Sequence, residues 1–128
     1  MKVDFHAVPR AVFTNPQVAG VGLRESEAND AGYDVLVGRA KYIDVAKGVA
    51  VAEEHGFVKV VIEEKTGKIL GCSIVGSEAP ELIQQVVYLM NSDSQDTGPL
   101  IRSQIIHPTL NEVLARALAN LEHSSSLR

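Results

Sequence analysis

Two patterns of hydrophobic residues alternate along the chain, one typical of strands and one typical of helices. The strand pattern is clearest in GFVKVVIEEKTGKILGCSIVG (residues 56–76), where two runs rich in valine and isoleucine flank a short polar segment. Gly67 in that segment can adopt the left-handed conformation of a hairpin loop, so the two runs predict an antiparallel hairpin. Upstream, VPRAVFTNPQVAGVG (residues 8–22) predicts two short extended pieces joined by a turn at Asn15-Pro16. YDVLVGRAKYI (residues 33–43) also has the composition of a strand.

A helical period begins after Gly76 and returns near the C-terminus. The first helix carries apolar residues at the spacing of one helix face, namely Ala79, Leu82, Ile83, Val86, Val87 and Met90. We expect Ser77 to cap it, with Pro80 in its first turn. A last helix is predicted from about Leu110 to Leu121. Its apolar stripe has the same spacing: Leu110, Val113, Leu114, Ala117, Leu118 and Leu121. Periodicity alone does not say whether such a stripe faces the core or a partner chain.

Shorter segments complete the prediction. RESEANDAGYD (residues 24–34) predicts a short helix that stops at Gly32. DVAKGVAVAEE (residues 44–54) fits a helix through its alanines and a strand through its valines. The fold class expected from all these segments is α+β: an antiparallel β-sheet of about four to five strands with helices packed on one face. We expect the domain to span residues 7–122, with flexible termini at 1–6 and 123–128, and we leave the polar tail LEHSSSLR out of the fold.

Composition narrows the possible partners and compartments. The 128 residues are 45% hydrophobic and 22% charged, with a net charge of −4 and no basic block. This balance gives no electrostatic support for nucleic acid or an anionic membrane as a partner. Cys72 is the sole cysteine, so the chain has no internal disulfide, and we expect a cytoplasmic protein. Inside a predicted strand, Cys72 is expected to be a small buried apolar residue.

The candidate chemistry lies in IIHPTLNEVLARAL (residues 105–118), where a histidine and a proline precede a predicted helix. Thr109 and Glu112 match a capping box, in which threonine caps the helix and the glutamate three residues later folds back to the threonine N–H. Glu112 could instead pair with Arg116 one turn later. Both interpretations are structural and need no catalysis.

A third interpretation is compatible with capping. Pro108 favours an extended conformation at His107, so a carboxylate that returns toward Thr109 could also reach the imidazole. A carboxylate on one ring nitrogen fixes the tautomer and leaves the other nitrogen to exchange a proton near neutral pH. The sequence shows no metal-ligand spacing among its four histidines, and no metal site is expected. It also shows no phosphate loop, nucleophile elbow or dinucleotide fingerprint.

Three segments together resemble a known family. VPRAVFTNPQVAGVGLRESEA, EEHGFVKVVIEEKTGKILGCSIVGSEAPELI and HPTLNE are similar, in order and spacing, to the C-terminal dimerisation domain of the FAD-dependent pyridine nucleotide–disulfide oxidoreductases. That family includes dihydrolipoamide dehydrogenase, glutathione reductase and mercuric reductase. The similarity runs from about Ala7 to Leu121. HPTLNE is closest to the form found in members like dihydrolipoamide dehydrogenase. The resemblance implies a cysteine pair near the C-terminus for a mercuric reductase, and its absence here counts against mercury as the substrate.

The resemblance implies a homodimer in which the histidine motif of one subunit completes the active site of the other. Carried over by position, His107 exchanges protons with substrate thiols, and Glu112 orients it. The backbone of His107, Pro108 and Thr109 borders the partner's flavin. Cis peptide bonds are implied before Pro16 and Pro108. FAD and NAD(P)H are the implied cofactors of the whole enzyme, whose FAD- and NAD-binding domains are further partners of this one.

This chain departs from the family in what it lacks. It contains neither the two cofactor-binding domains nor a C-x-x-x-x-C pair, so we expect it to be inactive alone and to bind no FAD tightly. We expect it to be a domain excised from a longer enzyme rather than a standalone relative. Two alternatives stay open: a non-catalytic dimerisation or scaffolding module, and an unrelated α+β hydrolase that uses His107 as its base.

Overall fold

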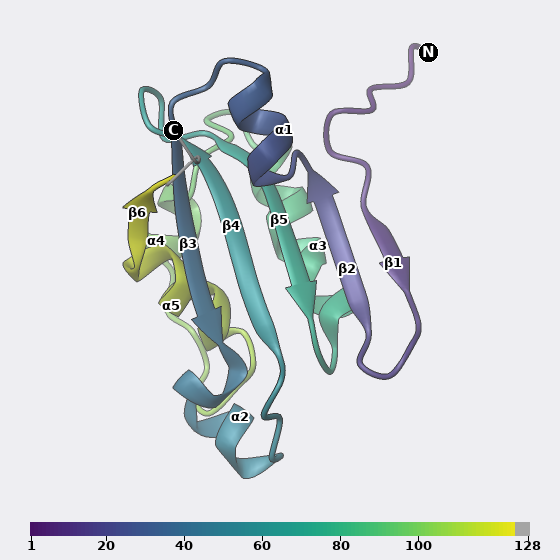
Figure 1. The fold of residues 1–128 in the computed structure, drawn as a ribbon, viewed down its shortest axis with the longest axis vertical. Coiled ribbons are helices and arrows are strands. Elements are labelled where there is room, and N and C mark those ends of the chain that lie inside the picture. The colour runs from purple at the N-terminus through teal and green to yellow at the C-terminus, as the bar shows by residue number, and fades with distance from the viewer. Residues whose placement is uncertain (125–128) are drawn as a thin grey trace.

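A six-stranded antiparallel sheet forms the centre of the protein in a computed structural model, which describes residues 1–124 (Figure 1). The strand order is β1-β2-β5-β4-β3-β6. The strands are β1 (Arg10–Val12), β2 (Val18–Gly22), β3 (Val35–Lys41), β4 (Phe57–Glu63), β5 (Ile69–Val75) and β6 (Leu121–His123). The helices are α1 (Glu25–Asp30), the short 3₁₀ helix η1 (Tyr42–Asp44), α2 (Ala46–Ala50), α3 (Ala79–Met90), α4 (Gly98–Arg102) and α5 (Glu112–Ala119). The α+β class is confirmed.

The two predicted hairpin turns are present. Gly67 has φ +73° between β4 and β5, and its N–H donates to the carbonyl of Glu63 at 2.8 Å. The turn between β1 and β2 contains a cis peptide bond at Asn15-Pro16, and the Thr14 hydroxyl donates to the Pro16 carbonyl at 2.8 Å. The peptide bond between His107 and Pro108 is also cis. Both cis bonds that the family resemblance implied are therefore confirmed.

The long helices cover one face of the sheet, each over its own half. α3 packs on β2 and β5, whereas α5 packs on β3 and β4. Figure 1 shows both helices behind the sheet and α1 in front of it. The main core lies under α3 and α5 and includes the whole predicted stripe of α3. A smaller cluster of Ala28, Val35, Val37 and Val61 lies under α1, so the other face is also partly covered.

Three local predictions were wrong or left open. Ser77 does not cap α3, because its hydroxyl donates to Oε2 of Glu53 at 2.6 Å, and Glu78, with φ 62°, precedes the helix instead. Residues 44–54, which the sequence left ambiguous, contain the end of η1, the helix α2 and a following turn, and no strand. The last helix runs from Glu112 to Ala119, shorter than predicted at both ends.

The tail contributes a strand that the sequence analysis left out of the fold. Leu121, Glu122 and His123 pair with Gly38, Val37 and Leu36 of β3, which makes β6 an edge strand. The helix α5 therefore runs directly into the sheet edge that it covers. The expected flexible terminus at 123–128 falls partly outside the described residues, which end at Ser124. No helix among residues 1–124 is long and apolar enough to span a membrane.

Candidate active site

His107 lies on a tight turn between α4 and α5. The hydroxyl of Thr109 donates to the carbonyl of Ile106 at 2.6 Å and so closes this turn across the cis His107-Pro108 bond. The capping box predicted Thr109 as the cap of α5, and this prediction is wrong. Asn111 precedes the helix, and the N–H groups of Val113 and Leu114 reach back only three residues, to Leu110 and Asn111. The hydroxyl of Thr109 shapes the turn instead of capping the helix.

Glu112 connects the turn to the helix through both carboxylate oxygens. Oε1 lies 2.8 Å from Nδ1 of His107, and Oε2 accepts the N–H of Thr109 at 3.3 Å. The return of the carboxylate to Thr109 and its contact with the imidazole thus occur together. The hydrogen bond with His107, followed by that from Thr109, lowers the pKa of Glu112 below its usual value. The alternative pair between Glu112 and Arg116 is not among the ion pairs of residues 1–124.

The carboxylate fixes the direction of the imidazole. An ionised carboxylate can only accept hydrogen bonds, so Nδ1 of His107 carries the proton that it donates to Glu112. In the neutral ring Nε2 is then an acceptor, and no group within residues 1–124 hydrogen-bonds to it. The His107 side chain is 67% exposed. This arrangement can take up a proton from a molecule outside the chain and return it.

His107 opens into a shallow groove of about 430 Å³ beside α5, which we call the His107 groove. It is lined by Asp44, Val45, Ala46, Ile105, His107, Glu112, Ala115, Arg116 and Ala119. Four of these residues come from α5, and three come from the end of η1 and the start of α2. The groove is open enough to admit a second molecule to the imidazole.

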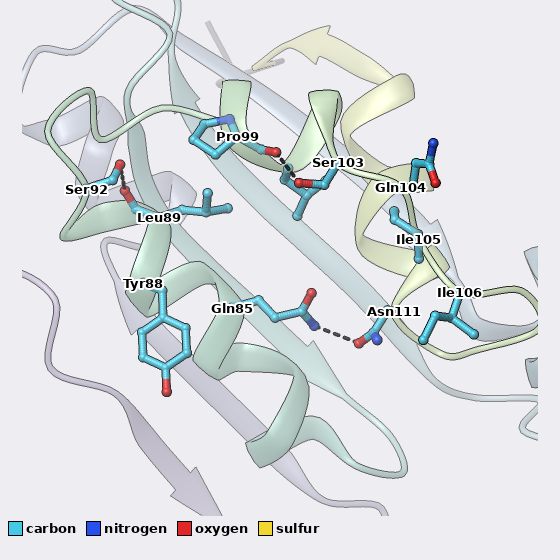
Figure 2. A pocket seen from close by; sticks show the side chains of 11 residues that line it. Gln85, Tyr88, Leu89, Ser92, Pro99, Ser103, Gln104, Ile105, Ile106 and Asn111 are labelled. Atoms are coloured by element: carbon cyan, nitrogen blue, oxygen red, sulfur yellow. Dashed lines mark hydrogen bonds between the residues drawn. The ribbon is translucent and has the colours of Figure 1, made fainter.

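A second groove of about 500 Å³ lies on the other side of the turn, and we call it the α3 groove (Figure 2). Its lining comes from α3 and from the chain between α3 and α5: Gln85, Tyr88, Leu89, Ser92, Pro99, Leu100, Ser103, Gln104, Ile105, Ile106 and Asn111. Tyr88 is 69% exposed and Ile106 is 78% exposed. Sequence reasoning missed this groove, although Tyr88 gave a signal as a large residue off the buried stripe of α3.

The other described histidines lie apart from the candidate site. His6 contacts the Asp4 carboxylate through Nδ1 at 2.9 Å and the Met90 carbonyl through Nε2 at 3.1 Å, a contact that the sequence analysis missed. His123 lies 3.4 Å from Glu64. Among residues 1–124, no group of three or more His, Cys, Asp or Glu residues could hold a metal ion. Cys72 is 1% exposed and unpaired by any disulfide, so its prediction as a buried apolar residue is confirmed.

The family model of the pyridine nucleotide-disulphide oxidoreductase dimerisation domain matches residues 8–118. The chain belongs to this family. The match covers the His107 turn, the α3 groove and all of the His107 groove except Ala119, and it confirms the family resemblance found in the sequence. Members of the family are FAD- and NAD(P)H-dependent oxidoreductases.

Individual relatives agree with the family match. A dihydrolipoyl dehydrogenase from Rhizobium etli is 40% identical over 115 residues, which is 90% of this chain and 24% of the relative. A mycothione reductase from Mycobacterium tuberculosis is 42% identical over 119 residues, 92% of this chain and 26% of the relative. This chain therefore spans about a quarter of the length of the curated relatives that it matches.

Solved structures show the same fold. The Cu(II) complex of RclA, a HOCl-induced flavoprotein disulfide reductase from Escherichia coli, superposes with a TM-score of 0.82 at 25% identity, covering 88% of this chain and 25% of that one. LpdA from Mycobacterium tuberculosis gives a TM-score of 0.84 at 23% identity, covering 93% of this chain and 26% of that one. The second similarity bears on the fold alone.

Proposed function

We propose that this chain is the dimerisation domain of a disulfide oxidoreductase similar to dihydrolipoamide dehydrogenase, and that it supplies His107 and Glu112 to the active site of a partner subunit. One observation carries the proposal: Glu112 holds Nδ1 of an imidazole that is 67% exposed, lines the His107 groove and has no hydrogen bond to Nε2 from residues 1–124. A histidine that served only to start a helix would not need an exposed, oriented ring.

The proposed chemistry is proton transfer during thiol–disulfide exchange. Nε2 of His107 accepts the proton of a substrate thiol, because the thiolate and not the thiol attacks a disulfide. As the new S–S bond forms, the old S–S bond breaks, and the leaving thiolate takes a proton from the imidazolium. Glu112 stabilises the imidazolium between these steps through its ionised carboxylate. The imidazole thus serves as base and acid in turn.

The base must act on sulfur atoms that another chain or molecule supplies. Cys72 is the one cysteine of this sequence, and it is buried in β5 under the helix layer. Burial raises the pKa of its thiol to about 12, which disfavours the thiolate that exchange requires. His107 is at the surface, and Ile106, its neighbour in the chain, lines the α3 groove together with Tyr88, both of them exposed apolar side chains. We therefore assign the α3 groove to contact with a second copy, related by a two-fold axis so that each subunit gives and receives the motif.

The residues present fit a flavin at the border of the site, held by another part of the enzyme. His107, Pro108 and Thr109 form a narrow exposed turn that can lie along a planar ring, but they do not enclose a dinucleotide. FAD and NAD(P)H would supply the two-electron chemistry when bound. The role that we propose for this chain is limited to holding and moving the proton at Nε2 of His107.

Substitution of His107 in the flavoprotein that contains this chain tests the proposal. We expect His107→Ala to lower dithiol–disulfide turnover by about 10²–10⁴-fold, the usual contribution of a general acid–base, with flavin content and dimer mass unchanged. His55→Ala is the matched control, because His55 lies in an exposed bend far along the chain from the turn. Unchanged turnover in His107→Ala would assign this domain a purely dimerising role.

A further inference from the structure

The two long helices are joined by a direct polar contact at the His107 turn. α3 packs over β2 and β5, whereas α5 packs over β3 and β4. Packing on the sheet therefore holds the two helices on different halves of it. Nε2 of Gln85 on α3 donates to Oδ1 of Asn111 at 2.8 Å, across 26 residues of sequence (Figure 2). Gln85 also approaches the Leu82 carbonyl of its own helix at 3.4 Å. The contact is partly buried, and both residues line the α3 groove.

Asn111 is the neighbour of Glu112 in the chain and takes part in the first turn of α5. It is the residue that directly precedes α5, and its carbonyl accepts the N–H of Leu114 in the first turn of that helix. Its own neighbour Leu110 packs against the main core. With its amide held by Gln85, the backbone on the N-terminal side of Glu112 is fixed to α3 as well as to the core.

We propose that Gln85 and Asn111 are positioning residues for the His107–Glu112 pair. Glu112 must reach His107 with one oxygen and Thr109 with the other, and both contacts depend on where α5 begins. The contact between Gln85 and Asn111 sets that point relative to α3, which lines the surface assigned above to the second copy. The inference rests on the proposed function of His107, since it gives the contact a catalytic consequence.

The contact is specific to its two partners. Gln84, the adjacent residue of α3, is also half-buried but makes no side-chain hydrogen bond within residues 1–124. Loss of one neutral hydrogen bond changes an equilibrium by about two- to tenfold. An effect of that size on the His107 turn is measurable without any effect on the fold, because Asn111 and Gln85 are not part of the apolar core.

A double-mutant cycle on the 128-residue chain tests the inference by NMR. The variants are Gln85→Ala, Asn111→Ala and both together, with Gln84→Ala as the matched control. We expect each single variant to accelerate exchange of the Thr109 amide proton by about two- to tenfold and to shift the ring ¹⁵N signals of His107 toward an even mixture of tautomers. The double variant should be no worse than either single variant, because both remove the same contact.

The experiments distinguish failure of the positioning role of Gln85 and Asn111 from failure of the proposed function of His107. Additive effects in the double variant, or Thr109 exchange and His107 signals equal to those of Gln84→Ala, would overturn the positioning role. In the flavoprotein, Asn111→Ala is expected to lower turnover two- to tenfold and to leave KM within twofold, because the proposed effect of Asn111 passes through Glu112 and the His107 turn. If His107→Ala leaves turnover intact while the NMR cycle shows coupling, the proposed function fails and the structural link stands.

Discussion

Glu112 holds Nδ1 of His107 at 2.8 Å with one oxygen, while its other oxygen accepts the N–H of Thr109. One carboxylate thus makes both contacts, to the turn and to the imidazole, that the sequence predicted to be compatible. The turn and the imidazole are coupled by this arrangement, because any change at Glu112 releases both partners together.

Glu112→Gln should destabilise the chain in a pH-dependent way. The depressed pKa of Glu112 means that its carboxylate stabilises the fold at pH values above the ordinary 4.5, and that this contribution is lost as the pH falls through the folded-state value. We expect the gap in unfolding free energy between the parent chain and Glu112→Gln to shrink as the pH falls from 5 toward 3. Urea titrations at each pH measure it. Glu81→Gln, on the exposed side of α3, serves as the control, and a gap that persists at pH 3 would refute the assignment.

Thr109→Val should loosen the turn that carries His107. Valine keeps the shape of threonine but removes the hydroxyl that donates to the Ile106 carbonyl at 2.6 Å. We expect a loss of about 0.5–1.5 kcal/mol in unfolding free energy, toward the lower end because water can reach the released carbonyl. Thr109→Ser retains the hydroxyl and should cost less than about 0.5 kcal/mol. A loss in Thr109→Ser as large as that in Thr109→Val would contradict the prediction, because the hydroxyl would then contribute no more than the methyl group.

Gly38→Ala should push α5 away from the sheet. A Cβ at Gly38 would stand 2.2 Å from the backbone oxygen of Ala117, and backbone cannot move aside as a side chain can. We expect a loss of about 1–3 kcal/mol in unfolding free energy from this overpacking. Gly20→Ala is the matched strand control, because the added Cβ would meet only the flexible guanidinium of Arg10, at 3.2 Å. Thermal melts of the two variants compare them, and equal stability would argue against close packing of α5 on β3.

Helices and strands with a clear hydrophobic period were predicted correctly from the sequence. Contacts between segments far apart in the chain were missed. The alternation in residues 56–76 and the stripe of Ala79 to Met90 predicted β4, β5 and α3 because periodicity reports which side chains must be buried. The short strand β6 has three exposed residues and no such pattern, so only its pairing with β3 defines it. At the site, HPTLNE predicted the meeting of His107 and Glu112 because both lie in one local turn.

Other features of the site depend on partners far along the chain. Ser77 had the right residue type and position for a helix cap. Its hydroxyl instead donates a hydrogen bond to the carboxylate of Glu53, 24 residues earlier in the chain. Gln85 and Asn111 are equally unremarkable in sequence and meet only because the sheet brings their helices together. No local propensity encodes either contact.

Cys72 should be inert in the folded chain. Complete burial raises the pKa of its thiol to about 12, and both reagent access and thiolate formation require opening of the core. We expect no measurable reaction with a disulfide dye at pH 8 over minutes, and one equivalent of reaction in denaturant. Fast reaction of the native chain would contradict the burial and would reopen a redox role for this residue.

His6 should fix the N-terminal segment to the end of α3 only while it is protonated. Nδ1 contacts the Asp4 carboxylate and Nε2 contacts the Met90 carbonyl, so both ring nitrogens act as donors, which only the imidazolium allows. The bond to Met90, then that to Asp4, raises the pKa of His6 above the ordinary 6.5. The contribution to stability is therefore complete below pH 6.5 and is lost as the pH rises through the folded-state value.

The gap in unfolding free energy between the parent chain and His6→Ala should be largest near pH 5.5 and should shrink toward pH 9. The groove at His6 also contains the charges of Arg10, Glu63 and Lys68, and their interactions with the His6 imidazolium are part of the gap because His6→Ala removes them. Asp4→Asn should reproduce part of the loss and weaken its pH dependence, because the amide no longer favours the imidazolium. An NMR titration of the His6 ring gives the direct measurement: a midpoint at or below 6.5 would show that the contacts to Asp4 and Met90 do not hold the charged form.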